Sequence, residues 1–349
     1  MTTIRERIRE KLQGDFLVDP RDPDLQELTH VTTSAGTSSR GLSFWRRLRE
    51  WLTQRTFATI TLLTCSLLVV ITLTMVMRSW PLLAAYPLRA LLTGQRWLPT
   101  QGLFGFAPFI WGSVLVTSLA LVIAVPPALL SGIYLAEFTS TRTRNILKPV
   151  LDLLVGIPSV VYGLWGVLFI VPLMRDHVAP WSDRTLGHWL PIFVRTNTSG
   201  YGLLTASLVL AIMVFPFIVA IADEVMRTVP RALREAALAV GATRWEATKL
   251  IVRRTAAAGL AAAVVLGFSR AFGETLAVMM LIGNTPQIPR SLFDAAYSLP
   301  ALIANNYGEM MSIPLYEGAL MTAALVLLSV VLIFNLLTSF MVHRLTSRG

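Results

Sequence analysis

Six long apolar segments constrain the fold of this chain more than any other feature of its 349 residues. Each segment can cross the hydrocarbon core of a bilayer as a helix, which takes about 20 residues. Apolar residues make up 54% of the sequence and charged residues only 14%, whereas a soluble domain carries about 25% charged residues. The sequence therefore predicts an all-α polytopic membrane protein. The predicted spans cover about 57–77, 108–136, 149–174, 201–222, 256–283 and 316–342.

The distribution of basic residues predicts the topology. With six spans both termini lie on one side of the membrane, and most of the 30 lysines and arginines flank the spans on that side. The positive-inside rule therefore places both termini in the cytoplasm. The basic residues that give the net charge of +10 orient the chain in the bilayer, so the charge does not indicate a nucleic-acid-binding surface. Cys65 is the single cysteine, so no internal disulfide can form.

Residues 1–56 are predicted to form a cytoplasmic N-terminal tail, and residues 57–349 a transmembrane domain. Residues 1–15 are charged and lack an apolar core, so we expect no cleaved signal peptide. The segment 44–57, FWRRLREWLTQRTF, combines aromatic and basic residues. This composition fits an interfacial helix on the cytoplasmic leaflet, and it fits equally well a basic flank that fixes the topology.

The third predicted span contains a run that weakens a regular helix, 156-GIPSVVYGLWG-166. Gly156, Pro158 and Gly163 lie within this run, and Pro158 removes one backbone hydrogen bond. Ser159 and Gly163 form a small-xxx-small pair that suits close helix contact. Two interpretations stay open. The run is either a kinked packing helix or a loosened turn that lines a pathway and bends during gating.

Two charged residues lie inside the fifth predicted span, in the run 268-FSRAFGETLAVMM-280. A charge at the centre of a bilayer costs about 2.5–3.5 kcal/mol on insertion scales, so a charged residue there needs a reason. Arg270 and Glu274 are four residues apart, which puts both on one face of a continuous helix. They form either a structural ion pair or a site that faces a common pathway.

The loop 223–255, on the predicted cytoplasmic side, has a clear helical pattern. Pro230 suits the first turn of a helix, and Gly241 can end that helix in the left-handed conformation. Thr243 then begins a capping box with Glu246, which starts a second helix. The sequence therefore predicts two short helices joined at Gly241. On these residues alone, the loop could be an ordinary connecting hairpin.

The same loop resembles the cytoplasmic loop of ABC importer permeases that depend on a binding protein. The pattern is Glu-Ala-Ala, then three residues, Gly, nine residues and Ile, matched here by Glu235, Ala236, Ala237, Gly241 and Ile251. The family usually ends the pattern with Leu-Pro, where this chain has Arg253 and Arg254. The resemblance implies the type I ABC importer permease fold. It also implies that the loop inserts into a groove on a partner ATPase and transmits nucleotide-driven motion.

Three longer runs, at 116–138, 148–166 and 267–285, resemble the permeases of phosphate-specific importers. The runs GIPSVVYGLWG and SRAFGETLAV are most similar to the C-type subunit, PstC. The resemblance implies a pathway for inorganic phosphate across the bacterial inner membrane. It implies a complex with a homologous A-type permease, two ATPase subunits and an extracytoplasmic phosphate-binding protein. The alternative is an A-type phosphate permease or a permease for another oxyanion, such as molybdate or sulfate.

For such a phosphate pathway, the chemistry of the intramembrane polar residues suggests their roles. Arg270 would contact phosphate in transit, because a guanidinium binds two phosphate oxygens and stays charged in the membrane. Glu274 would be its counter-charge or gate, and it could accept the proton of HPO4²⁻, which sulfate lacks. Ser159 and Tyr162 of the third span are placed on the same substrate pathway.

The sequence predicts that the chain itself is not an enzyme. Its only lysines are Lys11, Lys148 and Lys249, and none follows a glycine, so it contains no P-loop. We therefore expect the chain to bind no cofactor, and ATP and Mg²⁺ to be used by the partner ATPase. The histidines form no metal-binding cluster, and a membrane protease would need paired aspartates or an HExxH motif. A passive channel is a further alternative, but it would not explain the ATPase-coupling pattern around Glu235.

Overall fold

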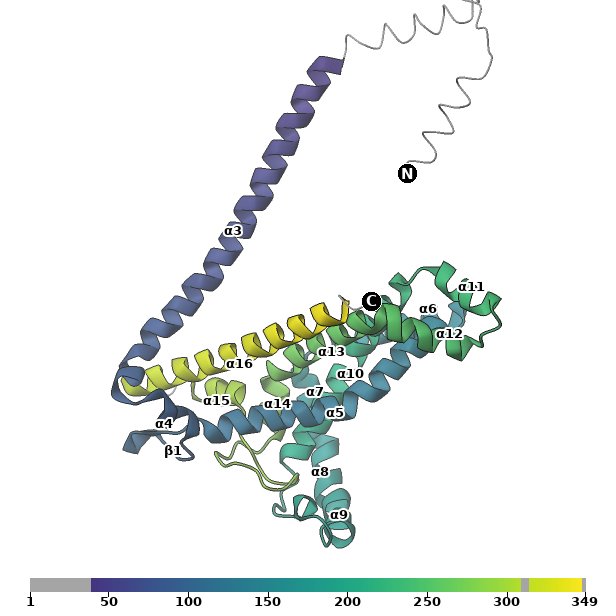
Figure 1. Cartoon of the computed structure of the whole chain (residues 1–349). Coiled ribbons are helices and arrows are strands. Elements are labelled where there is room, and N and C mark those ends of the chain that lie inside the picture. The colour runs from purple at the N-terminus through teal and green to yellow at the C-terminus, as the bar shows by residue number, and fades with distance from the viewer. Residues whose placement is uncertain (1–38, 309–313, 347–349) are drawn as a thin grey trace, which may run out of the picture. The chain divides into compact units, whose positions relative to one another are not determined.

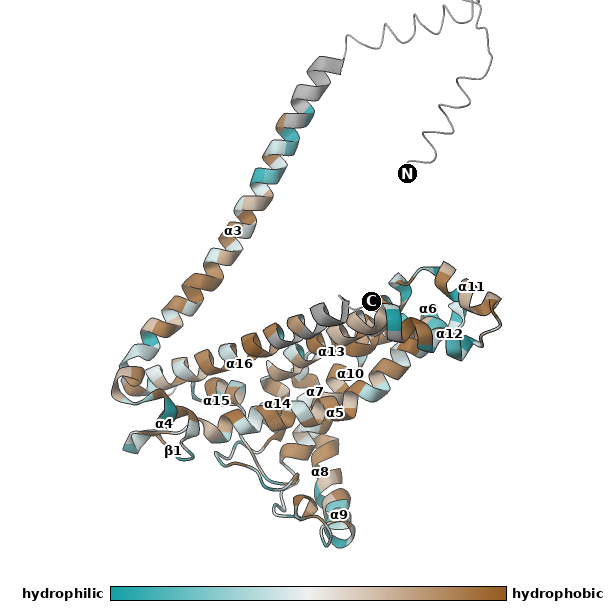
Figure 2. Cartoon of the chain, viewed as in Figure 1, coloured by the Kyte–Doolittle hydropathy of each residue, from teal (hydrophilic) through white to brown (hydrophobic). Residues whose placement is uncertain are grey.

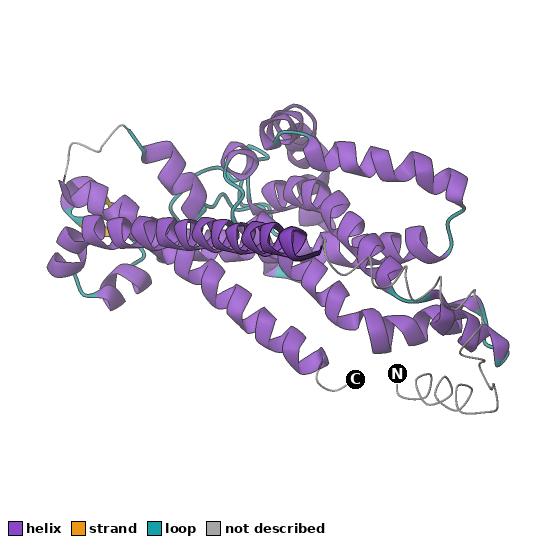
Figure 3. Cartoon of the chain, turned by 90° about the horizontal axis from the view of Figure 1, so that it is seen from above, coloured by secondary structure: helices purple, strands orange, loops and turns teal. Residues whose placement is uncertain are grey.

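The computed structural model describes residues 39–308 and 314–346, and this part of the chain is mostly helical (Figure 3). The α-helices are α3 (Ser39–Ala85), α4 (Leu88–Thr93), α5 (Ala107–Glu137), α6 (Thr141–Gly156), α7 (Ser159–Trp165), α8 (Val171–Leu173), α9 (Ala179–Thr185), α10 (Leu203–Thr228), α11 (Arg231–Ala239), α12 (Arg244–Ile251), α13 (Ala257–Phe272), α14 (Leu276–Leu281), α15 (Leu299–Asn306) and α16 (Pro314–Thr346). The π-helical turns are η2 (Gly166–Ile170), η3 (Met174–Val178) and η5 (Val252–Ala256), and the 3-10 turns are η1 (Pro99–Gln101) and η4 (Pro191–Phe193). Strands β1 (Trp97–Leu98) and β2 (Leu103–Phe104) form an antiparallel pair, with Trp97 opposite Phe104.

Six helical segments in the described part are long and apolar enough to cross a membrane, which confirms the predicted number of spans. They are Leu48–Ala85, Ala107–Glu137, Ser159–Thr185, Leu203–Thr228, Arg244–Phe272 and Leu315–Leu336. Figure 2 shows hydrophobic residues along α5, α10 and α16 and hydrophilic residues around α11 and α12. The cytoplasmic location of the termini stays a prediction from the positive-inside rule.

The chain divides into two compact units, residues 1–71 and 72–349. In the first unit the described residues belong to α3, which runs through 44–57 and through the predicted tail boundary at 56 without a break. The hydroxyl groups of Thr53, Thr56, Thr61 and Thr64 each donate to the carbonyl four residues earlier. Because lipid offers these hydroxyls no partner, bonding to the helix's own carbonyls lets an apolar span carry them.

The core of the second unit is the contact between α5 and α10, to which α13, α14 and the third span add. Small residues let the backbones approach, as is typical of helix pairs in membranes. A Cβ atom on Gly132 would lie 2.6 Å from the Cβ of Ala222, so α5 needs glycine at this contact. The Ser207 hydroxyl of α10 hydrogen-bonds the Val116 carbonyl of α5 at 3.1 Å. These contacts fix α5 and α10 as one rigid pair.

A second packed region joins the end of α3 with the strands, the start of α5, α15 and α16. Trp97 is partly buried against this region and makes edge-on ring contacts with Phe104 and Phe109. Helix α16 also packs along α13 (Figure 1). There the Ser269 hydroxyl hydrogen-bonds the Asn335 side chain at 2.8 Å. At this contact each helix supplies one polar group of the pair, so neither group is left unsatisfied in the apolar bundle.

The third predicted span, 149–174, is not one helix. Residues 149–156 belong to α6, and a new helix begins at Ser159 and continues through η2 and η3 to Thr185. Ile157 and Pro158 between them are extended, with ψ angles of 129° and 138°. Proline lacks the N–H that a helix needs and disfavours helical geometry in the preceding residue. The run at 156–166 therefore breaks the helix rather than kinking it.

The link after the fifth span, 284–315, is too apolar for a solvated loop, and its composition predicts that it dips into the membrane or docks against a partner. In its described part it packs on this chain's own helices. The backbone N–H groups of Leu203 and Leu204 donate to the carbonyls of Asp294 and Leu292. The N–H of Leu299 donates to the Ser113 hydroxyl of α5 at 2.8 Å. The link thus caps the start of α10.

Candidate functional site

Arg270 lies in the last turn of α13, where that helix meets α10 and the end of α6. Its guanidinium carbon is 5.1 Å from the centroid of the Phe217 ring of α10. One terminal nitrogen makes a long hydrogen bond, 3.5 Å, to the Val155 carbonyl of α6. Its Nε atom is buried and has no hydrogen-bond partner among the described residues. The guanidinium is therefore only partly satisfied, and it retains donor capacity for an anion.

Glu274 does not lie on the same helix as Arg270, so the prediction of one helix face carrying both is wrong. Helix α13 ends at Phe272 with Gly273 as its cap, and α14 begins at Leu276. A Glu274 carboxylate oxygen instead accepts the Ala277 N–H at 3.3 Å, in the first turn of α14. In the described chain no ion pair joins Arg270 to Glu274. Glycine, the weakest helix former after proline, marks the break.

The residues of the third span lie around the break at Ile157 and Pro158. The Tyr162 hydroxyl donates to the Leu154 carbonyl at 2.9 Å and so bridges from α7 back to α6. Arg270 bonds the next carbonyl along the chain, that of Val155. The structure thus brings Tyr162 together with Arg270 through the end of α6. Ser159 is half-buried at the start of α7.

The two glycines of this run have different surroundings. A Cβ atom on Gly163 would lie 2.8 Å from the Met280 sulfur and 3.2 Å from the Ala277 Cα, so α7 packs closely on α14. Gly156 has open space where a Cβ would point. Close packing therefore requires glycine at Gly163, whereas packing places no demand on Gly156.

The helical hairpin α11–α12 has the form predicted from the sequence. Gly241 takes a φ of 87°, and the N–H of Ala242 donates to the Ala237 carbonyl, which closes the end of α11. Thr243 and Glu246 form the predicted capping box at the start of α12. Left-handed geometry at Gly241 costs a residue with a side chain about 1–2 kcal/mol. Glycine there lets the chain turn between the two helices.

The residues of the Glu-Ala-Ala pattern divide between the two faces of the hairpin. Glu235 and Ala236 are exposed, whereas Ala237 and Ile251 are buried. Ile251 packs in a small cluster with Met226 of α10 and others at the base of the hairpin. The outer face carries exposed apolar side chains, namely Leu238, Val240 and Trp245. The hairpin is thus fixed at its base and offers an apolar outer face.

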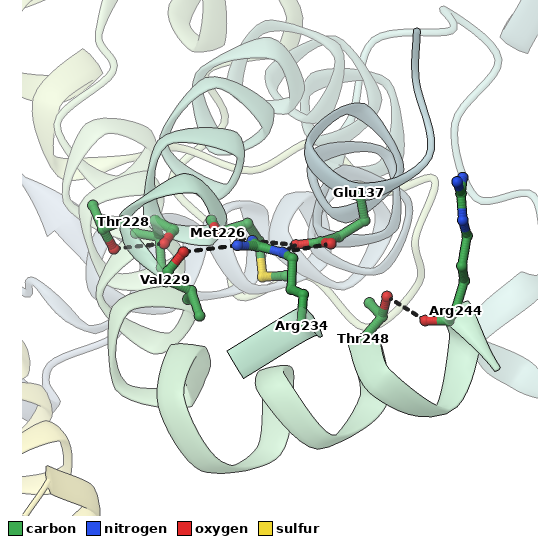
Figure 4. A network of polar contacts seen from close by, with 8 residues as sticks. Glu137, Met226, Thr228, Val229, Arg234, Arg244 and Thr248 are labelled. Carbon is green, nitrogen blue, oxygen red and sulfur yellow. Dashed lines mark hydrogen bonds and ion pairs between the residues drawn. The ribbon is translucent and has the colours of Figure 1, made fainter. Parts of the chain in front are cut away.

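Arg234 anchors the hairpin to two spans, a role that sequence reasoning missed (Figure 4). Its guanidinium donates to both carboxylate oxygens of Glu137, the last residue of α5, at 2.5–3.0 Å. It also donates to the carbonyls of Met226 and Val229 at the end of α10, each at 2.7 Å. Glu137 raises the pKa of Arg234, mainly through these hydrogen bonds. Two features of the sequence could have suggested this ion pair: Glu137 lies at the end of a predicted span, and Arg234 precedes Glu235 in the loop on the same side of the membrane.

A second ion pair joins α10 to α6 near the hairpin. Arg144 donates to the Asp223 carboxylate at 2.6 Å, and the Asp223 side chain is only 1% exposed. Lys148 and Glu224 form a longer and more exposed pair at 3.5 Å. Buried pairs lock helix positions because leaving one charge unpaired there is costly. In residues 39–308 and 314–346, no cluster of histidine, cysteine and acidic side chains could hold a metal ion.

Comparisons with known proteins show the family to which the chain belongs. The family model of the binding-protein-dependent transport system inner membrane component matches residues 128–348. This chain belongs to that family. As a binding-protein-dependent permease of the PstC type, it is 35% identical over 298 residues to the phosphate transport system permease protein PstC of Haemophilus influenzae. That alignment covers 85% of this chain and 94% of the relative.

Other permeases of the family are similarly related. The chain is 33% identical to the probable phosphate transport system permease protein PstC of Methanocaldococcus jannaschii, over 70% of this chain and 78% of that protein. It is 37% identical to the probable ABC transporter permease protein YqgH of Bacillus subtilis, over 72% of this chain and 77% of that protein. A chain of the MetNI methionine ABC transporter in an inward-facing conformation superposes with a TM-score of 0.51 and 17% identity, covering 72% of this chain and 99% of that one. The permease therefore has the type I ABC importer fold and lies in the inner membrane.

Proposed function

We propose that this ABC importer permease forms the pathway for inorganic phosphate together with a homologous second permease. The proposal rests on one observation above the others: a PstC-type chain keeps an arginine inside its bundle with its Nε unpaired among the described residues. Arg270 there meets an aromatic ring and a carbonyl instead of a carboxylate. An anion in transit supplies the missing negative charge and accepts hydrogen bonds from the guanidinium.

Glu274 acts in this proposal as a gate rather than as a partner of Arg270. Its carboxylate accepts an N–H in the first turn of α14, and α14 packs closely on α7 through Gly163. A carboxylate can accept the proton of HPO4²⁻, and forming that bond withdraws it from the helix cap. Binding of phosphate thereby loosens α14 against α7, next to Tyr162. Sulfate and molybdate carry no proton near neutral pH, so they do not form this bond.

The energy for transport comes from ATP hydrolysis by partner subunits. The hairpin α11–α12 docks on an ATPase through Glu235, Ala236 and its exposed apolar face, while Ala237, Gly241 and Ile251 maintain its shape. Two ATPase subunits use ATP and Mg²⁺, and the permease binds neither. An extracytoplasmic phosphate-binding protein delivers the anion. The buried pair of Glu137 and Arg234 supports this division of roles, because it joins the hairpin directly to α5 and α10.

The test is transport in proteoliposomes that contain the permease purified with its native partners. The expected result is ATP-dependent uptake of phosphate, with little uptake of sulfate or molybdate. Arg270→Gln should abolish uptake, and Glu274→Gln should weaken the preference for phosphate over sulfate. Arg290→Gln and Glu224→Gln are matched controls at exposed positions and should transport normally.

Assembly is measured separately by the recovery of all subunits. If Arg270→Gln and Glu274→Gln assemble and import phosphate at the normal rate, neither residue acts in the pathway. Uptake that proceeds without ATP would overturn the importer mechanism. Uptake of molybdate or sulfate in preference to phosphate would assign the pathway to another oxyanion.

A further inference from the structure

A cavity of about 520 Å³ lies where the ends of α5 and α10, the start of α6 and helix α11 meet. Charged side chains dominate its lining, namely Arg144, Arg227, Arg231, Arg234, Glu137 and Glu235. It lies at the hairpin end of the bundle, which the positive-inside rule places in the cytoplasm. The pathway residue Arg270 is not part of its lining. The cavity is therefore separate from the proposed transport site.

Two of the four arginines are already paired with acids. Arg234 binds Glu137, and Arg144 binds Asp223. The other two, Arg227 and Arg231, make neither a hydrogen bond nor an ion pair with any residue that the structure describes. Glu235 lies one turn after Arg231 on α11 but forms no ion pair with it in the described chain. Both side chains are exposed, so the cavity presents two guanidinium groups that have no partner among the described residues.

We propose that this cavity binds a phosphate-bearing anion through Arg227 and Arg231. A guanidinium recognises phosphate well because its parallel N–H groups match two phosphate oxygens. The lining carries four arginines against two glutamates, so its net charge is positive, and Thr141 adds a hydroxyl. Such a ligand is either a soluble phosphate from the cytoplasm or the headgroup of an anionic phospholipid. Both present the same anionic phosphate group to the two arginines.

The position of the cavity gives the bound anion a structural consequence. Arg227 lies in the last turn of α10 and Arg231 begins α11, so a phosphate held by both spans the joint between a membrane helix and the hairpin. The cavity wall also contains Arg234, which ties the hairpin to α5, and Arg144 of α6. An occupied cavity therefore stiffens the hairpin against the bundle. This inference does not depend on which oxyanion the pathway carries.

The first test measures binding of inorganic phosphate to the full chain in nanodiscs of phosphatidylcholine. The protein carries Arg270→Gln, which removes the proposed pathway site, so that failure of one proposal is separate from failure of the other. Radiolabelled phosphate should bind saturably. The double variant Arg227→Gln/Arg231→Gln should weaken binding by about tenfold or more, the loss expected when charge-assisted hydrogen bonds are removed.

Arg142→Gln is the matched control, because Arg142 is an exposed arginine of α6 that does not line the cavity. It removes the same charge on the same side of the protein and should leave phosphate binding within about twofold, as expected for a screened surface charge. The single variants Arg227→Gln and Arg231→Gln are measured beside the double variant. Size-exclusion chromatography and circular dichroism check that each variant is folded.

The second test addresses the lipid source. The unfolding temperature of the full chain is compared in phosphatidylcholine and in mixtures that contain phosphatidylglycerol. If a headgroup is the ligand, phosphatidylglycerol raises the unfolding temperature of the parent protein and not that of Arg227→Gln/Arg231→Gln. A response in either test that depends on these two arginines supports the proposal and identifies the source. No response in both tests, or equal losses in Arg142→Gln, would overturn it.

Discussion

Glu137 accepts three hydrogen bonds from the Arg234 guanidinium, at 2.5–3.0 Å, across 97 residues of sequence. The same guanidinium donates to the carbonyls of Met226 and Val229, which have no helical partner at the end of α10. One side chain therefore joins α5, α10 and the first helix of the hairpin. In the proposed mechanism, this side chain is the contact through which motion of α11 reaches two spans of the bundle.

Glu137→Gln should separate ATP hydrolysis from transport. The substitution leaves Arg234 in a site that is mostly buried without its counter-charge, which costs about 2 kcal/mol or more. We expect a lower unfolding temperature and a higher number of ATP molecules hydrolysed per anion imported. The measurement is ATPase activity and uptake in the same proteoliposomes.

The control for this prediction is the exposed pair of Lys148 and Glu224. Glu224→Gln should change stability by less than about 1 kcal/mol, as is usual for surface ion pairs. A double-mutant cycle of Glu137→Gln and Arg234→Gln should give a clear interaction energy. Additive effects in that cycle would show that the two side chains act independently.

Gly241→Val should destabilise the hairpin without affecting the rest of the fold. Gly241 has a φ of 87°, and no atom lies within 4 Å of the position of a Cβ, so the penalty is conformational rather than steric. It should amount to about 1–2 kcal/mol. Gly241→Asn should cost less, because asparagine tolerates this geometry. Proteolysis at the turn and recovery of the ATPase measure the effect. Equal recovery with valine and asparagine would contradict it.

Gly163→Ala and Gly156→Ala should have opposite effects on stability. A Cβ on Gly163 meets the Met280 sulfur and the Ala277 backbone, so alanine there forces α7 away from α14, which costs about 1–3 kcal/mol. Gly156 has open space and ends α6, so alanine there should be neutral or stabilising by up to about 1 kcal/mol. The unfolding temperatures of the two variants, compared with that of the parent protein, test this prediction. Lower transport by a stable Gly156→Ala variant would support a hinge at this position.

Arg270→Lys should separate charge from geometry in the pathway. Lysine keeps the positive charge but loses the planar pair of donors that matches two phosphate oxygens. We expect phosphate uptake between that of the parent protein and that of Arg270→Gln, with the larger change in KM. Full activity in Arg270→Lys would mean that charge alone is sufficient.

Much of the fold follows from local pattern. The six spans depend on apolar length, and the hairpin depends on Gly241 and on the capping box of Thr243 and Glu246, all of which act between residues close in sequence. Such features are predictable because their energies come from neighbouring residues. The Glu-Ala-Ala pattern and the run around Arg270 are also short stretches of contiguous sequence, so they indicated the family without any knowledge of the tertiary structure.

Helix breaks were harder to predict than helices. The apolar composition of 149–174 and 256–283 is continuous, but α6 ends before Pro158 and α13 ends at Phe272, before Gly273. Apolar length cannot distinguish one helix from two that meet at an angle, because both bury similar side chains. The spacing of Arg270 and Glu274 suggested a pair, and the break at Gly273 separates them onto two helices.

The sequence by itself determined the class of protein, its spans, its hairpin and the presence of an arginine in the bundle. Only the tertiary structure decided the partners of the charged residues: Glu137 with Arg234, Asp223 with Arg144, and Arg270 with an aromatic ring and a carbonyl. The physical reason is that the partners of a buried charge are whichever groups helix packing brings into contact with it. Those groups come from helices far apart in the sequence, so no local pattern encodes them.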